Sequence, residues 1–258
     1  MDRAPSIAAR FAALADDPAR VRLEGLHPLK HALRFGGEVE LAVSPDPRAL
    51  LALARTLCPD LLERLEALVE PVPAGLFAAL GPPPPSPVLA IARRPRVDTS
   101  ALLAPSGPAP VLLLDRPVHA GNLGAVVRVA AALGAAGVLT LGGVDPWSPA
   151  ALRGSSGLHF ALPVARLERL GEPVERPLVA LHPEGPILDP AAPTALPPGA
   201  LLAFGSERHG LDPALRARAG AVLAIPMRPG VSSLNLATAA AIVLWEARRR
   251  LPPEPRAG

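Results

Sequence analysis

The sequence predicts an α/β protein in which a parallel β-sheet forms the core of the C-terminal part. Half of the 258 residues are apolar, so the chain can bury a sizeable core. From Val111 onward, short and almost continuous apolar runs alternate with longer segments. Such runs are typical of strands in a parallel sheet that helices cover on both faces. The length fits two domains, or one large α/β domain with an appendage.

The N-terminal part, residues 1–104, is expected to form a small α/β domain of its own. Apolar residues recur at helical spacing, with charges on the opposite face, in the segments 48–57 and 60–69. The basic segment 92–96 either contacts a phosphate backbone or forms a solvated edge. We expect further helices at 6–14 and 28–34, and strands at 39–43 and 88–91.

A proline-rich segment at 98–110 is the predicted linker to the second domain, residues 105–258. Several apolar runs in that domain end in glycine or proline, which closes a strand with a turn. Ligands of parallel sheets bind at the carboxyl ends of the strands, so we expect a ligand site at that edge. The predicted strands of this domain are 111–114, 138–141, 178–181, 201–204 and 222–225.

Composition restricts the location of the protein. No run of 18 apolar residues is present, and the first residues lack the pattern of a signal peptide. Cys58 is the single cysteine and cannot form an internal disulfide. The histidines show no metal-ligand spacing. We therefore expect a cytoplasmic protein without a membrane partner and without a bound metal.

The basic and amide residues are unusual. Lys30 is the only lysine, and every other basic side chain is an arginine, at a net charge of +3. Arginine binds phosphate bidentately and stacks on bases, which suits an RNA partner, although codon bias or a thermophilic source would give the same composition. The chain has no glutamine and two asparagines, Asn122 and Asn235. This depletion of amide residues suggests that the two asparagines occupy positions where no other residue type can replace them.

The segment Gly121–Gly134 follows a predicted strand and has the pattern of a glycine turn and a helix. Its polar residues Asn122 and Arg128 stand out against alanine, valine and leucine. At about 100° per residue, six residues within a helix would place the two on different faces. We therefore place Asn122 in the turn at the start of the helix and Arg128 inside it.

Two further segments share this mixture of glycine and polar residues, at 204–211 and 225–235. Each alone has an ordinary explanation, such as a strand-to-helix turn, a solvated Glu207, or a helix N-cap at Ser233. Their order and spacing in one chain are far more specific.

Together the three segments resemble the SpoU branch of the SPOUT RNA methyltransferases, also called the TrmH-like family, over residues 111–249. The chain departs from the family pattern at two places. Many members have Asp-Pro where this chain has His119-Ala120, and a glutamate where it has Ser232. The resemblance therefore indicates the activity more firmly than the substrate. The residues that carry the resemblance are Asn122 and Arg128 in the first motif, Arg153–Gly157 and Leu162–Val164 in a connecting piece, Gly205–Glu207 with Gly210-Leu211 in the second motif, and Ile225–Met227 with Ser233–Asn235 in the third.

The resemblance implies transfer of a methyl group from S-adenosylmethionine to a ribose 2′-hydroxyl in RNA, with ribosomal RNA preferred and transfer RNA next. It also implies a deep trefoil knot at the carboxyl end of the sheet, and a homodimer through the C-terminal domain with the active site near the interface. The N-terminal domain is similar, on pattern more than motif, to ribosomal protein L30e and would bind the RNA substrate.

The resemblance also implies roles for individual residues. A guanidinium with a pKa above about 12 is a poor base, so we favour Arg128 as the charge that stabilises the developing alkoxide, with a structural salt bridge as the alternative. Asn235 either acts at the site or only caps the last helix. His119 and His209 lie beside motifs and are candidates for substrate contact. The implied catalytic residues are Arg128, Asn122, Glu207, Ser233 and Asn235, and the implied cofactor-binding residues are Leu141, Gly142, Gly205, Ile225, Met227 and Leu234.

Two other functions compete with this hypothesis. A catalytically silent RNA-binding protein could have the same scaffold. A nucleotide-binding dehydrogenase of the doubly wound type is disfavoured, because no Gly-x-Gly-x-x-Gly follows the first strand of the sheet.

Overall fold

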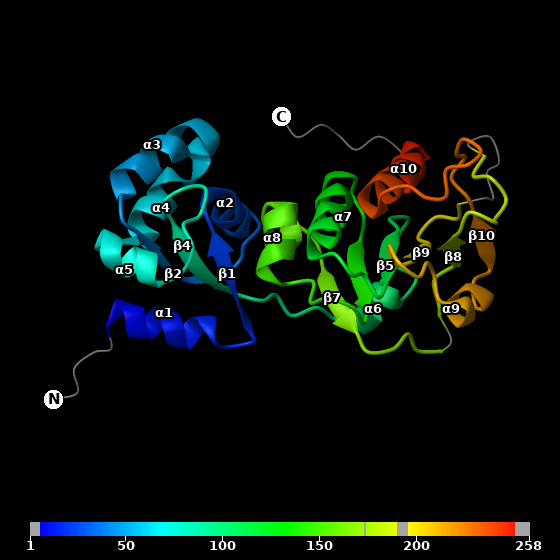
Figure 1. The fold of residues 1–258 in the computed structure, drawn as a ribbon, viewed down its shortest axis with the longest axis horizontal. Coiled ribbons are helices and arrows are strands. Elements are labelled where there is room, and N and C mark those ends of the chain that lie inside the picture. Colours follow the sequence, from blue (N-terminus) through cyan, green and yellow to red (C-terminus); the bar gives the residue numbers. More distant parts are fainter. Residues whose placement is uncertain (1–5, 173, 190–195, 251–258) are drawn as a thin grey trace. The chain divides into compact units, whose positions relative to one another are not determined.

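The computed structural model describes residues 6–172, 174–189 and 196–250, and the chain divides into two compact units (Figure 1). Unit 1 comprises Met1–Arg96 together with Trp147–Ala161. Unit 2 comprises Val97–Pro146 and Leu162–Gly258. No helix in the described part of the chain is both long and apolar enough to span a membrane.

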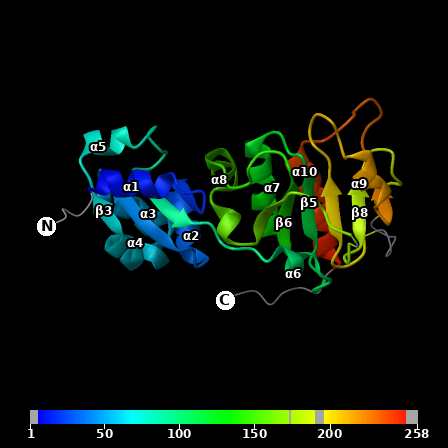
Figure 2. The ribbon, with the colours of Figure 1, turned by 90° about the horizontal axis from the view of Figure 1, so that it is seen from below.

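Unit 1 is built on a four-stranded mixed sheet in the order β1-β4-β2-β3. Phe11 and Phe77, from α1 and α5, join Leu41, Val43 and Ile91 in a buried cluster on one face. On the other side of the sheet lie α2, α3 and α4 (Figure 2). The strands are β1 (Arg20–Glu24), β2 (Val39–Ser44), β3 (Val69–Pro71) and β4 (Leu89–Arg93), and the helices are α1 (Ile7–Ala15), α2 (Leu26–Arg34), α3 (Pro47–Leu57), α4 (Leu62–Leu68) and α5 (Ala74–Ala79).

The segment Trp147–Ala161, which contains α8 (Pro149–Ser155), belongs to unit 1 although its neighbours in the sequence belong to unit 2. Arg153 forms an ion pair of 2.7 Å with Glu24 at the end of β1. A Cβ atom at Gly157 would lie 2.4 Å from the Cα of Pro28, and the φ of Gly157 is 81°. This contact therefore requires glycine, both for its conformation and for the close approach.

Unit 2 contains six parallel strands in the order β10-β8-β9-β5-β6-β7. On one face, Leu102 of α6, Leu215 of α9 and Leu211, which precedes α9, contribute to the buried core, and α7 and α10 lie side by side on the other face (Figure 1). The strands are β5 (Val111–Asp115), β6 (Gly137–Leu141), β7 (Val164–Leu167), β8 (Leu178–Leu181), β9 (Leu201–Phe204) and β10 (Ala221–Leu223), and the helices are α6 (Thr99–Leu103), α7 (Ala120–Ala132), α9 (Pro213–Ala217) and α10 (Leu236–Arg249).

The parallel sheet predicted from the apolar runs is confirmed, and two details differ. The predicted linker 98–110 is wrong over its first half, because α6 forms there and its Leu102 packs into the core of unit 2. The last predicted strand, 222–225, is β10 at Ala221–Leu223. Ala224 forms an isolated bridge with Ile187, and Pro226 has no N–H to continue a ladder, so the chain leaves the sheet at this point.

Candidate functional site

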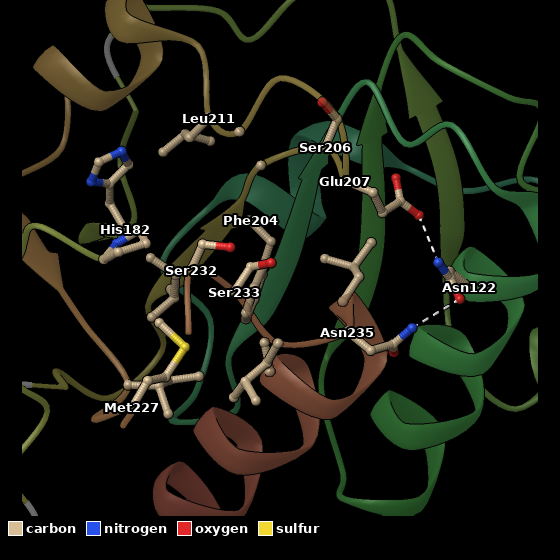
Figure 3. Close-up of a pocket in the computed structure, with 18 of the residues that line it drawn as sticks. Asn122, His182, Phe204, Ser206, Glu207, Leu211, Met227, Ser232, Ser233 and Asn235 are labelled. Atoms are coloured by element: carbon tan, nitrogen blue, oxygen red, sulfur yellow. Dashed lines mark hydrogen bonds between the residues drawn. The ribbon is translucent and has the colours of Figure 1, made fainter. Parts of the chain in front are cut away.

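A pocket with a volume of about 560 Å³ lies at the carboxyl ends of β8, β9 and β10 (Figure 3). This is the edge of the sheet at which the sequence predicts a ligand site. The pocket is large enough for a cofactor-sized molecule, since such sites measure roughly 300–1,000 Å³. Its lining combines apolar strand ends with polar side chains: His119, Asn122, Leu181, His182, Pro183, Phe204, Gly205, Ser206, Glu207, Gly210, Leu211, Leu223, Ile225, Met227, Ser232, Ser233, Leu234, Asn235, Leu236 and Ala239.

Asn122 lines the pocket from the first turn of α7. The helix begins at Ala120 after an N-cap at His119, so Asn122 is its third residue. The predicted position in a turn before the helix is therefore wrong: both Asn122 and Arg128 lie within α7, and they face different directions. Asn122 reaches the pocket, whereas Arg128 is exposed and does not line it.

Glu207 follows β9 in a short loop that closes on itself. The backbone amides and carbonyls of Ser206 and Gly210 form two reciprocal hydrogen bonds of 3.0 Å. Outside this closed loop, the carboxylate of Glu207 accepts a hydrogen bond of 2.9 Å from Asn122 Nδ2 and one of 3.2 Å from the Val118 amide.

The protonation of Glu207 depends on these contacts. Partial burial by itself would raise the pKa of the carboxyl. The hydrogen bonds from Asn122, from the backbone amide of Glu207 and from Val118, together with the nearby His119, outweigh this and hold the pKa of Glu207 below its ordinary value. Glu207 is therefore an anion at neutral pH.

Asn235 completes a chain of three polar side chains. It is the N-cap of α10, where its Oδ1 accepts hydrogen bonds from the amides of Ala237 at 2.9 Å and Thr238 at 3.4 Å. Its Nδ2 donates to Asn122 Oδ1 at 3.1 Å (Figure 3). Asn235 is thus a cap and a network member at once, and both asparagines of the chain hydrogen-bond to each other.

Most of the residues expected to bind a cofactor line the pocket. Ile225, Met227 and Leu234 contribute to its wall, and Ser233 lies beside them. Gly205 begins the Glu207 loop and lies against the end of that loop, at Gly210 and Leu211. A Cβ atom at position 205 would be 2.1 Å from the backbone of these two residues, so only glycine fits there.

Three predicted site residues lie elsewhere. Leu141 and Gly142 are at the end of β6, which β5 separates from β9, and they do not line this pocket. Arg128 is the third. Their roles stay predictions.

Several pocket residues were not named as site residues from the sequence, among them His182 and Phe204. His182 directly follows β8, and its Nε2 lies 3.3 Å from Arg216 Nη1. Phe204 is the last residue of β9 and is 3% exposed. The rule that ligands bind at strand ends would have identified both residues, since each stands at the carboxyl end of a predicted strand. In the part of the chain that the structure describes, no cluster of three or more histidine, cysteine or acidic residues could hold a metal ion.

Comparison with known proteins gives relatives over most of the chain. The chain is 31% identical over 269 residues to a 23S rRNA (uridine(2479)-2′-O)-methyltransferase from Streptomyces viridochromogenes, which covers 94% of this chain and 84% of that protein. It is 37% identical over 148 residues to an uncharacterised tRNA/rRNA methyltransferase from Synechocystis, which covers 54% of this chain. The chain therefore spans only about half, 53%, of the length of the Synechocystis protein.

Solved structures show a similar fold over most of the chain. The SpoU methyltransferase AviRb from Streptomyces viridochromogenes, in complex with the cofactor AdoMet, superposes with a TM-score of 0.76 at 27% identity. The match covers 95% of this chain and 98% of that one. The model of the SpoU rRNA Methylase family matches residues 109–245, which include the Asn122, Glu207 and Asn235 network and the whole pocket edge of the sheet. This chain belongs to the SpoU rRNA methylase family.

Proposed function

We propose that the protein transfers a methyl group from S-adenosylmethionine to the 2′-hydroxyl of a ribose in RNA, and that its substrate is ribosomal RNA. The observation that carries this proposal is the convergence of Asn122, Glu207 and Asn235 beside a pocket at the carboxyl edge of the sheet. The 23S rRNA methyltransferase to which the chain is 31% identical over 94% of its length supports the choice of ribosomal RNA.

The pocket suits S-adenosylmethionine in size and in chemistry. Phe204, Leu223 and Leu236 provide apolar surface for an adenine ring, and Gly205 contributes backbone to the lining. Ser232 and Ser233 contribute hydroxyl groups to the same lining (Figure 3). When bound, the cofactor would supply an electrophilic methyl group.

The residues of the chain would orient the ribose. The amide of Asn122 has two donor hydrogens, and one of them is used by Glu207, so the second is available to an oxygen of the substrate. Glu207 and Asn235 fix the orientation of that amide from both sides. A fixed donor of this kind contributes through positioning, which can supply a large share of the rate of a methyl transfer.

We further propose that Arg128 acts across a homodimer. Arg128 is exposed on α7 and is distant from the pocket lining of its own chain. Trp245 on the neighbouring α10 is 58% exposed and Ile242 is 38% exposed, which gives this helix pair an apolar surface for a second copy. In the dimer, Arg128 of one copy would stabilise the developing alkoxide in the pocket of the other.

Mixing two inactive variants tests this arrangement. Arg128→Ala and Glu207→Gln each remove one part of the site. If the parts come from different chains, half of the randomly mixed dimers contain one intact site of their two, so about a quarter of the wild-type activity returns. No recovery, with dimers shown by sedimentation, would place Arg128 and Glu207 in the same site of one chain.

We infer that the N-terminal part of the chain, up to Arg96, forms an L30e-like domain that binds the RNA substrate, and that the loops around the pocket form a trefoil knot. The knot is supported by the route of the chain: β10 is an edge strand beside β8, yet α10 returns to pack against α7. The chain must therefore cross the carboxyl edge of the sheet between Leu223 and Leu236. We expect the protein to act in the cytoplasm, where its substrate is made.

The central test is methyl incorporation. The protein is incubated with labelled S-adenosylmethionine and total RNA from a strain that lacks the gene, and labelled nucleotides are then mapped. Transfer to a ribose of ribosomal RNA supports the proposal, and transfer only to transfer RNA corrects its substrate. Cofactor binding by calorimetry without incorporation into any RNA would identify a catalytically silent RNA-binding protein. Binding of a nicotinamide dinucleotide instead of S-adenosylmethionine would overturn the assignment.

A further inference from the structure

A second polar cluster lies beside the site, at the end of β5, and no sequence motif singled it out. Its centre is Asp115, the last residue of the strand, whose side chain is 2% exposed. The Asp115 carboxylate accepts hydrogen bonds from Arg116 Nε at 3.0 Å, from Arg116 Nη2 at 3.1 Å and from the Asp212 amide at 2.8 Å. Arg116 Nη2 also lies 3.2 Å from Asp212 Oδ2. These three residues, Asp115, Arg116 and Asp212, are called the clasp below.

The backbone of Arg116 is strained. Its φ is 47°, and among the described residues only Ser156 shares a positive φ without being glycine. A side chain in the left-handed region persists only where the surrounding structure enforces it, and such positions gather at functional sites. Here the Arg116 amide donates to the carbonyl of Leu141 at 3.0 Å, while the guanidinium is held by two carboxylates.

The clasp is connected to Glu207 by two routes. Asp212 follows the closed Glu207 loop and caps α9 by accepting from the Ala214 amide at 2.8 Å, so the clasp fixes the far end of the loop. Val118, two residues after Arg116, donates its amide to the Glu207 carboxylate at 3.2 Å. The turn at Arg116 therefore determines where one of the hydrogen-bond donors of Glu207 lies.

We propose that Asp115 and Arg116 are positioning residues that hold the Glu207 carboxylate between the Val118 amide and Asn122. The alternative, a direct contact between Arg116 and RNA phosphate, is disfavoured because the guanidinium is already engaged by two carboxylates. The catalytic part of this inference rests on the proposed function. The hydrogen bond between the Val118 amide and Glu207 is observed whether or not that function is correct.

Three variants separate the parts of the clasp. Arg116→Gly removes the guanidinium but suits the positive φ, so it relieves strain while it opens the clasp. Arg116→Lys keeps the charge without the bidentate geometry. Asp212→Asn retains a good N-cap and loses the ion pair to Arg116. Glu172→Gln is the matched control, since it breaks an exposed ion pair with Arg218, 3.2 Å long, in the same unit.

We expect kcat of Arg116→Gly to fall about 10-fold or more, because a small misplacement of a positioning group is costly. The Kd for S-adenosylmethionine, measured by calorimetry, should change by less than about 3-fold, since the hydrogen bonds and ion pairs described above for the clasp do not involve the pocket residues Ile225, Met227 and Leu234. Arg116→Lys and Asp212→Asn should show the same pattern to a smaller extent, and Glu172→Gln should match the wild type.

Hydrogen exchange gives a readout that is independent of activity. The amides of Val118 and Asp212 should exchange faster in Arg116→Gly than in the wild type, while the amides of α10 keep their protection. A purely structural role would lower Tm, kcat and cofactor affinity together. Unchanged kcat and unchanged exchange at Val118 would overturn the inference. A wild-type protein that methylates no RNA would count against the proposed function, and the exchange at Val118 would still decide the role of the clasp.

Discussion

The two edges of the parallel sheet in unit 2 each hold a polar network, and the two networks are built in opposite ways. At the amino edge, Arg176 is 1% exposed and donates to the carbonyls of Leu102 at 2.8 Å and Gly199 at 2.7 Å. Its remaining donors reach Ala109 and Ser106. At the carboxyl edge, Asn122, Glu207 and Asn235 line an open pocket.

The difference lies in what each network leaves unused. The five N–H donors of a guanidinium find protein acceptors around Arg176, so this network is closed and can only stabilise. Asn122 keeps a free donor toward the pocket, and the Glu207 carboxylate keeps spare acceptor capacity. We infer that the closed buried network is structural and that the open network beside the pocket is a site for a ligand. The predictions below test this contrast.

The largest expected effect is on stability, from Arg176→Met. The variant keeps much of the apolar stem but leaves several buried carbonyl groups without donors. Each buried carbonyl left without a donor costs about 1–3 kcal/mol of the free energy of unfolding. Urea unfolding measures this loss. At a temperature where the variant is folded, its methyl transfer should equal that of the wild type.

The alternative outcome for Arg176 is equally clear. If Arg176→Met has the same free energy of unfolding as the wild type, the closed network makes no net contribution to stability. Replacement of buried charged groups by apolar residues is neutral in this way in some proteins. If the folded variant loses methyl transfer, the two edges of the sheet are coupled, and the contrast between them is wrong.

The next effect is on activity, from Glu207→Gln. Glutamine keeps the shape, but its amide can turn a donor toward Val118 or Asn122, both of which donate to Glu207. We expect methyl transfer to fall about 100-fold, or about 2.7 kcal/mol in activation free energy. The free energy of unfolding should change little, because Glu207 is exposed to solvent. Single-turnover kinetics on the mapped RNA measures the loss, and Glu172→Gln, which removes an exposed partner of Arg218, is the control.

Sequence reasoning predicted the parallel sheet because its signal is local: apolar runs such as Val111–Leu114 and Leu201–Phe204 can be buried only in such a sheet. It also predicted the pocket edge and all three members of the polar network. The clasp was not predicted, because the contacts of Asp115 and Arg116 with Asp212 join residues that are distant in the sequence.

Other parts depended on packing that periodicity does not encode. Residues 98–103 stand next to prolines and polar residues that are typical of a linker. They nevertheless form α6, because Leu102 packs into the core of unit 2. Trp147–Ala161 folds with unit 1 because Gly157 fits against Pro28 and Arg153 pairs with Glu24. Contacts of this kind join residues more than 100 positions apart, which no local pattern reveals.

A smaller effect separates the two roles of Asn235. Asn235→Asp keeps an oxygen that caps α10, and a negative charge suits the start of a helix. It loses the donor to Asn122 Oδ1 and adds an anion near Glu207. We expect an unchanged or higher Tm and methyl transfer about 10-fold lower.

The matched control for Asn235 is Asp46→Asn, which exchanges the same two residue types at the N-cap of α3. It should leave methyl transfer unchanged. If Asn235→Asp is as active as the wild type, Asn235 is a cap alone, and the open network consists of Asn122 and Glu207.

The smallest expected effect is a pH dependence of stability at Glu207. Because its pKa is below the ordinary value in the folded protein, the carboxylate contributes stability above the unfolded pKa of about 4.3. This contribution is lost as the pH falls through the lower folded pKa. The difference in the free energy of unfolding between the wild type and Glu207→Gln should therefore be constant at neutral pH and shrink in acid, as urea unfolding across pH can measure. If burial outweighed the hydrogen bonds, Glu207→Gln would instead be more stable than the wild type at neutral pH, with the two converging in acid. That result would mean that the open network is held in place at a cost in stability.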